Sequence, residues 1–370
     1  MERQVKIVCT VTNDLNFDQR MNRICSSLVK AGYDVTLVGR KLPHSIPLKK
    51  QVFKQKRLFC FFKAGKLFYL EYNIRLFWYL MWTKFDLVCG IDLDTLVPAY
   101  LTSVLKRKVC IYDAHEYFSE VPEVINRPLT KKVWEGIAAL IIPRLKYCYT
   151  VGTQLSGVFQ QRYGTPFAVI RNMPVSQPND IKVSVPDPGK EKILFYQGAI
   201  NMGRGLEALV AAMAQLKNYR LWIAGDGDIR SALEQQVAAS GNRDRIVFLG
   251  RVSPDKLREM TPKAWLGLNL LENKGLNYYY SLANKYFDYV QAGVPVLQMQ
   301  FPEYIHLNQQ FRTAILIESL QADTIASAVL ALEKDQNLYE VLKSNCLEAS
   351  KIWNWEQEES CLIDFYRKIN

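Results

Sequence analysis

The sequence lacks the glycine-rich loop that binds a dinucleotide, although it opens in the manner of a nucleotide-binding sheet. Residues 5–12 form an apolar run typical of a strand, and Asp18 precedes a helix-like segment that ends near Lys30. The connecting loop, residues 13–17, contains no glycine, so the GxGxxG pattern of NAD enzymes is absent. The strand-helix-strand opening predicts a doubly wound α/β sheet, and the missing pattern argues against a NAD enzyme.

Cysteine is present but scattered, and histidine is scarce. The eight cysteines include no CxxC pair and no zinc-type spacing, and Cys9, Cys89 and Cys110 lie inside apolar, strand-like runs. This usage is typical of small core residues in a reducing compartment. The chain has only three histidines, and neither a metal nor a cofactor is expected.

Long apolar runs are also missing. Near the most basic part of the chain the longest is 76–82, which is too short to span a bilayer. The N-terminus enters a strand-like run at once and has no signal-peptide pattern. We therefore expect a cytoplasmic protein whose contact with the membrane is peripheral, at the inner face.

Acidic residues nearly disappear from residues 49–84, where nine Lys or Arg face Glu71 alone and aromatic side chains lie between them. The whole chain carries a net charge of +11, which indicates an anionic partner. The pattern in 49–84 predicts a helix or loop at an anionic membrane surface. A core helix with snorkelling lysines and a nucleic-acid site remain alternatives, although no nucleic acid is expected.

The length of 370 residues and the 49% hydrophobic content suit two domains. We predict a first domain over 1–173 and a second over 191–352. The segment 174–190 holds four prolines and no apolar period, which predicts an extended linker. A helix is expected in the terminal segment 353–370.

One stretch of the second domain points to a ligand. The apolar run 265–271 predicts a buried strand, and 284–292 predicts a helix that Gly293 ends. The start of such a helix suits a phosphate, and Lys285 lies in its first turn. Asp288 follows one turn later and could accept ribose hydroxyls. The alternative is an ordinary βαβ unit with solvated charges.

A glycine-rich turn follows the predicted strand 192–196. Gly198 allows a tight turn, and Gly203 allows the backbone to approach a ligand closely. Arg204 begins the next helix and could pair with a phosphate. A turn with a solvated arginine remains the alternative.

The stretch Ser281-Leu-Ala-Asn-Lys-Tyr-Phe-Asp-Tyr-Val-Gln-Ala-Gly-Val-Pro-Val resembles the donor-site segment of retaining glycosyltransferases of family 4. Many members have Leu-Pro-Asn-Lys, two residues, Glu-Tyr and then Ala-Gly-x-Pro-Val. Here Ala283 replaces the proline, Asp288 replaces the ribose-binding glutamate, and Tyr280 stands where another glutamate is usual. The resemblance implies the GT-B fold: two Rossmann-like domains facing a cleft, with the helix in 353–370 packing back on the first domain.

The resemblance also implies a site. In the family an arginine and a lysine hold the donor diphosphate; here Ala199 takes the place of the arginine and Arg204 that of the lysine, and Lys285 could compensate. His115, in an Asp-x-His-Glu stretch just past a predicted strand, is expected to contact the transferred sugar. The implied donor-binding residues are Gly198, Gly203, Asp226, Arg251, Glu272, Ser281, Leu282, Asn284 and Asp288.

The implied function is metal-independent, retaining transfer of a hexosyl-type sugar from a UDP- or GDP-sugar to a hydroxyl. The basic aromatic segment suggests a membrane-associated glycolipid or polysaccharide acceptor, such as a lipid-linked oligosaccharide or lipopolysaccharide core, in cell-surface polysaccharide biosynthesis. Two alternatives stay open. One is a degenerate nucleotide-sugar-binding subunit or membrane scaffold without turnover, and the other is a GT-B nucleotide-sugar 2-epimerase.

Overall fold

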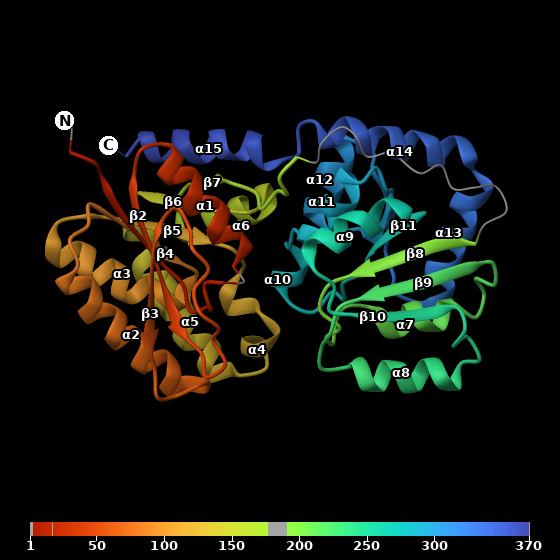
Figure 1. Ribbon diagram of the computed structural model, residues 1–370, viewed down its shortest axis with the longest axis horizontal. Helices are drawn as coiled ribbons and strands as arrows, with labels where there is room; N and C mark the ends of the chain where they lie inside the picture. Colours follow the sequence, from red (N-terminus) through yellow and green to blue (C-terminus); the bar gives the residue numbers. More distant parts are fainter. Residues whose placement is uncertain (1–2, 17, 177–190, 370) are drawn as a thin grey trace. The chain divides into compact units, whose positions relative to one another are not determined.

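The computed structural model describes residues 3–16, 18–176 and 191–369, which form two α/β units (Figure 1). Unit 1 contains the chain up to Asn172 together with the segment from Glu358, and unit 2 runs from Met173 to Gln357. Most of the expected linker, residues 177–190, lies outside the described residues. Each unit is built on a parallel sheet flanked by helices, which confirms the predicted α/β class.

Unit 1 has a seven-stranded sheet in the order β3-β2-β1-β4-β5-β6-β7, with parallel pairing throughout. The strands are β1 (Lys6–Thr10), β2 (Asp34–Lys41), β3 (Lys54–Phe59), β4 (Leu87–Ile91), β5 (Val109–Ala114), β6 (Tyr147–Thr150) and β7 (Phe167–Val169). The winding direction reverses between β1 and β4, so the loops after these two strands meet at one edge of the sheet.

The main helices of unit 1 connect these strands. They are α1 (Gln19–Lys30), α2 (Gly65–Trp82), α3 (Leu93–Lys106), α4 (Pro122–Ile125), α5 (Pro128–Ile141) and α6 (Thr153–Tyr163). Asp18 caps α1 as expected, because its carboxylate accepts the Met21 N–H at 3.0 Å. Cys9, Cys89 and Cys110 are buried and unpaired, which confirms their assignment to the core.

The basic segment 49–84 is part of this framework. We expected a helix or loop, but residues 54–59 form the edge strand β3, which pairs in parallel with β2 from Thr36↔Lys54 to Lys41↔Phe59. The sequence did not predict this strand because an edge strand can expose most of its side chains to solvent, so these residues show no apolar pattern. The 18-residue helix α2 follows. No helix in the described part of the chain is both long and apolar enough to cross a membrane.

Unit 2 has a six-stranded sheet in the order β10-β9-β8-β11-β12-β13. The strands are β8 (Lys192–Gln197), β9 (Tyr219–Ala224), β10 (Ile246–Gly250), β11 (Leu266–Asn269), β12 (Val296–Met299) and β13 (Ala314–Ile317). The main helices are α7 (Leu206–Ala212), α8 (Arg230–Ala239), α9 (Pro254–Met260), α10 (Leu276–Tyr279), α11 (Asn284–Gln291), α12 (Pro302–Gln310), α13 (Ala322–Lys334) and α14 (Gln336–Ser350). Here the winding direction reverses between β8 and β11.

The last helix, α15 (Trp355–Arg367), lies with unit 1 from Glu358 onward (Figure 1). The Phe365 ring packs edge-on against Tyr149 with centroids 5.1 Å apart, and Lys30 pairs with Glu359 at 3.0 Å. We expected this helix over 353–370, but it begins at Trp355, and Trp353 is not part of it. Its indole packs inside unit 2 against aromatic rings that include Phe311 at 5.3 Å.

Candidate functional site

The loops after β8 and β11 meet at the reversal point of the unit 2 sheet, where an open α/β sheet holds its ligands. The Glu272 N–H donates to the Gly203 carbonyl at 3.0 Å, so the two loops are joined through their backbones. Helix α11 starts directly behind the second loop. This arrangement brings the predicted glycine-rich turn and the predicted phosphate-binding helix together.

Two glycines allow the close packing of this region. Gly198 has φ of +136°, and a Cβ placed there would lie 3.2 Å from the Lys285 ammonium nitrogen. Gly203 has φ of +84°, and a Cβ there would lie 3.0 Å from the Tyr278 ring. A side chain at either position would strain the backbone and push against one of these groups.

Lys285 projects from the first turn of α11 over the face of Tyr196, with its nitrogen 3.8 Å from the ring centroid. Burial, together with repulsion from Arg204, lowers the pKa of Lys285 well below its usual value, and attraction to Asp288 only partly opposes this. Within the described residues, no hydrogen bond or ion pair holds this ammonium group. A bound anion would stabilise the charged form.

Arg204 lies in a similar environment. Its guanidinium carbon lies 5.2 Å from the centroid of the Tyr278 ring, and its buried Nε has no hydrogen-bond partner among the described residues. Two cationic side chains are therefore held against tyrosine faces beside one another, with unsatisfied donors. Such a pair suits a group with two adjacent negative charges, such as a diphosphate.

The remaining residues expected on α11 have defined positions. The Gln197 amide donates to Asp288 Oδ2 at 2.9 Å, which fixes that carboxylate beside the end of β8. Asn284 is exposed at the first position of the helix. The Ala283 N–H just before it donates to the Tyr304 hydroxyl at 3.0 Å, so the protein already uses one donor of this helix start.

Three further expected donor residues make contacts within unit 2. The Ser281 hydroxyl donates to the Tyr278 carbonyl at 2.8 Å, and Leu282 packs against the hydrophobic core of unit 2. The Glu272 carboxylate pairs with its neighbour Lys274. Their role in donor binding stays a prediction.

Asp226 and Arg251 follow β9 and β10, on the side of β8 away from β11. The Arg251 Nε donates to Asp226 Oδ2 at 3.2 Å, and the Arg251 side chain is 86% exposed. The Gly225 N–H donates to the Gly250 carbonyl at 2.7 Å and joins the two loops. The pair lies at the same edge of the sheet as Lys285, one and two strands beyond β8.

In unit 1, His115 lies directly after β5, as expected. Its Nε2 is 2.9 Å from Asp113 Oδ2, and its backbone N–H donates to Asp92 Oδ1 at 2.9 Å. Burial lowers the pKa of His115, but the carboxylates of Asp113 and Asp92 outweigh it, so the pKa is raised. Asp113 is itself paired with buried Arg20 at 3.1 Å. The imidazole is held firmly and favours its protonated form.

Asp92 and Asp94 were missed as site residues. Asp92 has φ of +55°, a strained conformation for a residue other than glycine, directly after β4 at the reversal point of the sheet. Burial raises the pKa of Asp94 to about 7, although a hydrogen bond from the Thr12 hydroxyl at 2.6 Å opposes the rise. Their place after a buried strand was a usable signal, because a ligand is expected at that edge.

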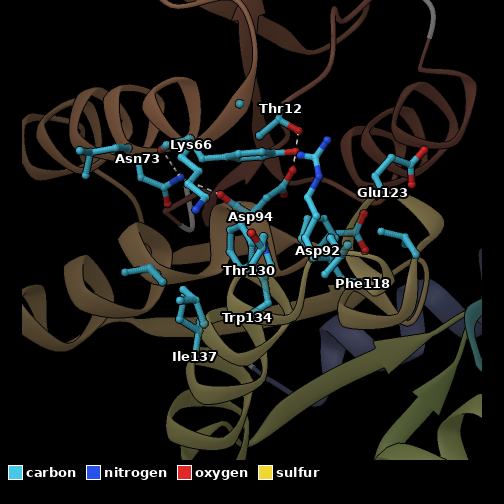
Figure 2. A pocket seen from close by; sticks show the side chains of 18 of the residues that line it. Thr12, Lys66, Asn73, Asp92, Asp94, Phe118, Glu123, Thr130, Trp134 and Ile137 are labelled. Atoms are coloured by element: carbon cyan, nitrogen blue, oxygen red, sulfur yellow. Dashed lines mark hydrogen bonds between the residues drawn. The ribbon is translucent and has the colours of Figure 1, made fainter.

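A cavity of about 940 Å³ opens beside these carboxylates, and all of its lining residues belong to unit 1. In Figure 2, Thr12, Asn73 and Asp94 lie together on one side, while Trp134 and Ile137 of α5 lie on the other. The Asn73 amide donates to the Asp94 carbonyl at 2.9 Å, which joins α2 to the start of α3. In the described residues, no cluster of three or more His, Cys, Asp or Glu has the arrangement of a metal site.

The outer surface of α2 is apolar at regular intervals. Five large side chains at spacings of three or four residues are exposed, and Trp82 is 82% exposed. These residues, called the α2 stripe below, are Leu67, Leu70, Ile74, Trp78 and Trp82. One face of the helix is therefore apolar and open to solvent.

Comparison with known proteins gives two kinds of match. Residues 178–348 match the family model of glycosyl transferases group 1. Over 183 residues the chain is 25% identical to an uncharacterised glycosyltransferase of Methanocaldococcus jannaschii, a match that covers 48% of this chain and only 45% of that relative. The matched region includes the loop and helix that carry Arg204 and Lys285.

Solved structures resemble the whole chain. Sucrose-phosphate synthase of Thermosynechococcus elongatus superposes with a TM-score of 0.80 at 18% identity, covering 99% of both chains. An Anabaena protein, HepE, in complex with UDP and glucose superposes with a TM-score of 0.74 at 13% identity, also covering 99% of both chains. These likenesses show the GT-B fold.

Proposed function

We propose that this protein is a glycosyltransferase that moves a sugar from a nucleotide-diphosphate sugar to an acceptor hydroxyl, on the premise that residues 178–348 carry a glycosyl transferases group 1 domain. The observation that carries the proposal is the pair of Arg204 and Lys285. Both lie at the reversal point of the unit 2 sheet against tyrosine rings, and the buried Nε of Arg204 has no hydrogen-bond partner among the described residues. UDP bound to the similar HepE structure supports a nucleotide donor.

The two cations would act on the leaving group. Negative charge grows on the diphosphate as the glycosidic bond breaks, and fixed cations close to it lower the barrier. Arg204 and Lys285 supply this charge without a metal, and Asp288 binds the ribose hydroxyls. His115, held by Asp113, contacts the transferred sugar. UDP and GDP are both candidates for the nucleotide.

We propose retention of the anomeric configuration, by displacement on the face from which the diphosphate leaves. The resemblance of residues 281–296 to retaining enzymes supports this, as does the lack of a clearly placed carboxylate nucleophile in the sequence. Proton NMR of the product would reveal the anomeric configuration. An inverted product, or a glycosyl adduct trapped on an Asp or Glu, would contradict the proposal.

A thermal-shift titration with UDP, GDP, ADP and their sugars, with and without EDTA, tests the donor site. One nucleotide diphosphate should raise the melting temperature by the same amount with and without EDTA. Arg204→Ala should weaken its binding about 10- to 100-fold, as expected for loss of a charge-assisted hydrogen bond. Arg258→Ala is the control, because Arg258 is an exposed arginine in the same unit, paired with Asp255 at 3.0 Å. No shift with any nucleotide, or equal losses in both variants, would refute the donor site. Binding without turnover would indicate a non-catalytic subunit.

The acceptor is proposed to be membrane-associated, such as a lipid-linked oligosaccharide or a lipopolysaccharide core at the cytoplasmic face. The α2 stripe supports this, since basic residues flank it in the segment 49–84. Sedimentation with phosphatidylglycerol vesicles tests it. Trp82→Glu should reduce binding, and Val341→Glu, an exposed apolar position in unit 2, should not. Failure of the wild type to bind at low salt would contradict it.

A further inference from the structure

The cavity of unit 1 has two chemically different parts. Its inner part lies at the carboxyl ends of β1 and β4, and its outer part lies between α2 and α5. The outer part is lined mainly by apolar side chains. A free sugar carries hydroxyl groups around its ring and would leave most of this apolar surface uncovered.

The inner part is polar and acidic. Asp94 is only 6% exposed, and the half-buried Asp92 and Glu116 also line the cavity. The two cationic lining residues, Lys66 and Arg127, are exposed, so water and salt screen their charges. A phosphate at the inner part would meet three acidic residues, whereas uncharged hydroxyls could share hydrogen bonds with their carboxyl groups.

The outer part offers hydrocarbon. Leu129, Val133 and Ile137 follow one another at intervals of four residues on α5, so they form a row along the helix. Leu70 lines the opposite side from α2. Leu129 and Val133 are 74% and 60% exposed, which leaves apolar surface that a hydrocarbon chain would cover.

Aromatic rings join the two parts. The Trp134 indole packs edge-on against Tyr69 with centroids 5.6 Å apart, and against Phe118 at 5.0 Å. Leu70 belongs both to the cavity lining and to the α2 stripe, so the apolar wall continues onto the exposed surface of the helix. A lipid lying on that surface could extend into the cavity along Leu70.

We infer that this cavity binds an amphiphile: an uncharged, hydroxyl-bearing head at Asp92 and Asp94, with its hydrocarbon chain along the row of α5. The inference rests on the proposed function in one respect, since the hydroxyl held there is the acceptor of the transferred sugar. It narrows the acceptor to a glycolipid or lipid alcohol that carries no phosphate beside the reacting hydroxyl.

The test is direct binding of alkyl glucosides to the full chain, at concentrations below micelle formation, by isothermal titration calorimetry. Affinity should rise about fourfold with each methylene from hexyl to octyl glucoside, as expected for burial of one methylene group. Alkyl phosphates of equal chain length should bind at least tenfold more weakly. Tighter binding of the phosphates, or no dependence on chain length, would overturn the inference.

Two matched variants locate the binding. Val133→Glu places a charge in the row, whereas Leu140→Glu changes a residue of the same helix that is also 60% exposed but does not line the cavity. Only Val133→Glu should abolish the dependence on chain length; equal losses in both would refute the cavity as the site. UDP titration of both variants separates the two proposals, because alkyl glucoside binding without any nucleotide binding would refute the transferase and leave the amphiphile site standing.

Discussion

Replacing Asp94 with asparagine should stabilise unit 1 above neutral pH. Asp94 is 6% exposed, and burial raises the pKa of its carboxyl from 3.8 to about 7. Between these values the folded protein keeps a proton that the unfolded chain has released. The free energy of unfolding therefore falls as pH rises through this range, and the loss is complete above about pH 7.

The size of the effect follows from the two pKa values. A difference from 3.8 to about 7 corresponds to about 4 kcal/mol, at 1.36 kcal/mol for each pKa unit. About 3 kcal/mol of this lies between pH 5 and pH 8. Asparagine does not ionise, and its carbonyl can still accept the hydrogen bond from the Thr12 hydroxyl. Between pH 5 and pH 8, the free energy of unfolding of the variant should therefore rise by about 3 kcal/mol relative to that of the wild type.

Urea unfolding of the full chain at pH 5, 6, 7 and 8 tests this prediction. Hydrogen exchange of peptides from β1 and β4, measured by mass spectrometry, would report the free energy of unfolding of unit 1 separately from unit 2. Parallel pH profiles for Asp94→Asn and the wild type would refute the reasoning, because they would mean that the carboxyl is ionised in the folded protein well below pH 7.

Three further predictions concern charged groups. Lys285→Met should weaken binding of the nucleotide diphosphate about 10- to 100-fold in titrations. Because the pKa of Lys285 is lowered in the folded protein, unit 2 of the wild type should become more stable as pH rises toward 10.5. Lys285→Met should remove this rise. His115→Ala should lower transfer about 10- to 100-fold in a kinetic assay while UDP affinity stays unchanged, and a matching loss of affinity would contradict its place at the sugar. Asp86→Asn should destabilise unit 1 by about 1 to 3 kcal/mol at pH 7 in urea unfolding, because Lys108 and the Lys6 N–H bond this carboxylate at 2.9 and 3.1 Å. Burial tends to raise the pKa of Asp86, but these bonds outweigh it, so the pKa is lowered. The difference in unfolding free energy between the wild type and Asp86→Asn should therefore shrink as pH falls below 3.8. A difference that does not change with pH would refute the stabilising role of the Asp86 carboxylate.

The sheets could be predicted in part from the sequence because several inner strands lie within short, mainly apolar runs. The predicted runs 5–12 and 265–271 contain β1 and β11, which are both inner strands. The edge strand β3 could not be found this way, since only Leu58 of its six residues is buried. Its pairing with β2 depends on backbone bonds that leave no trace in hydrophobic periodicity.

The donor side of the candidate site was predictable in part because its key groups lie close together along the chain. Lys285 and Asp288 share one helix, and Gly203 and Arg204 share one turn. The stacking on Tyr196 and Tyr278 was not predictable, because it depends on how β8 and the loop before α11 pack. The order of residues along the chain shows which groups lie near one another, but the packing of the folded unit determines which side chains they contact.

The cavity of unit 1 was wholly missed, for a similar reason. Its walls come from α2, the start of α3 and α5, which are separated along the chain by strands of the sheet. No single stretch of sequence contains both the acidic part and the apolar row. A hollow between elements has no periodicity, so only the three-dimensional arrangement reveals it.

The discontinuity of unit 1 has a consequence for synthesis on the ribosome. Tyr366 is fully buried in unit 1, where its ring packs against those of Tyr33 and Tyr149. The first unit to be translated is thus completed only after residue 366 has emerged, whereas all of unit 2 emerges earlier as one continuous segment. The usual N-terminal-first order of co-translational folding is therefore reversed for the final step. Until then, the nascent chain exposes the aromatic surface around Tyr33 and Tyr149 that α15 later covers, a surface that chaperones could bind.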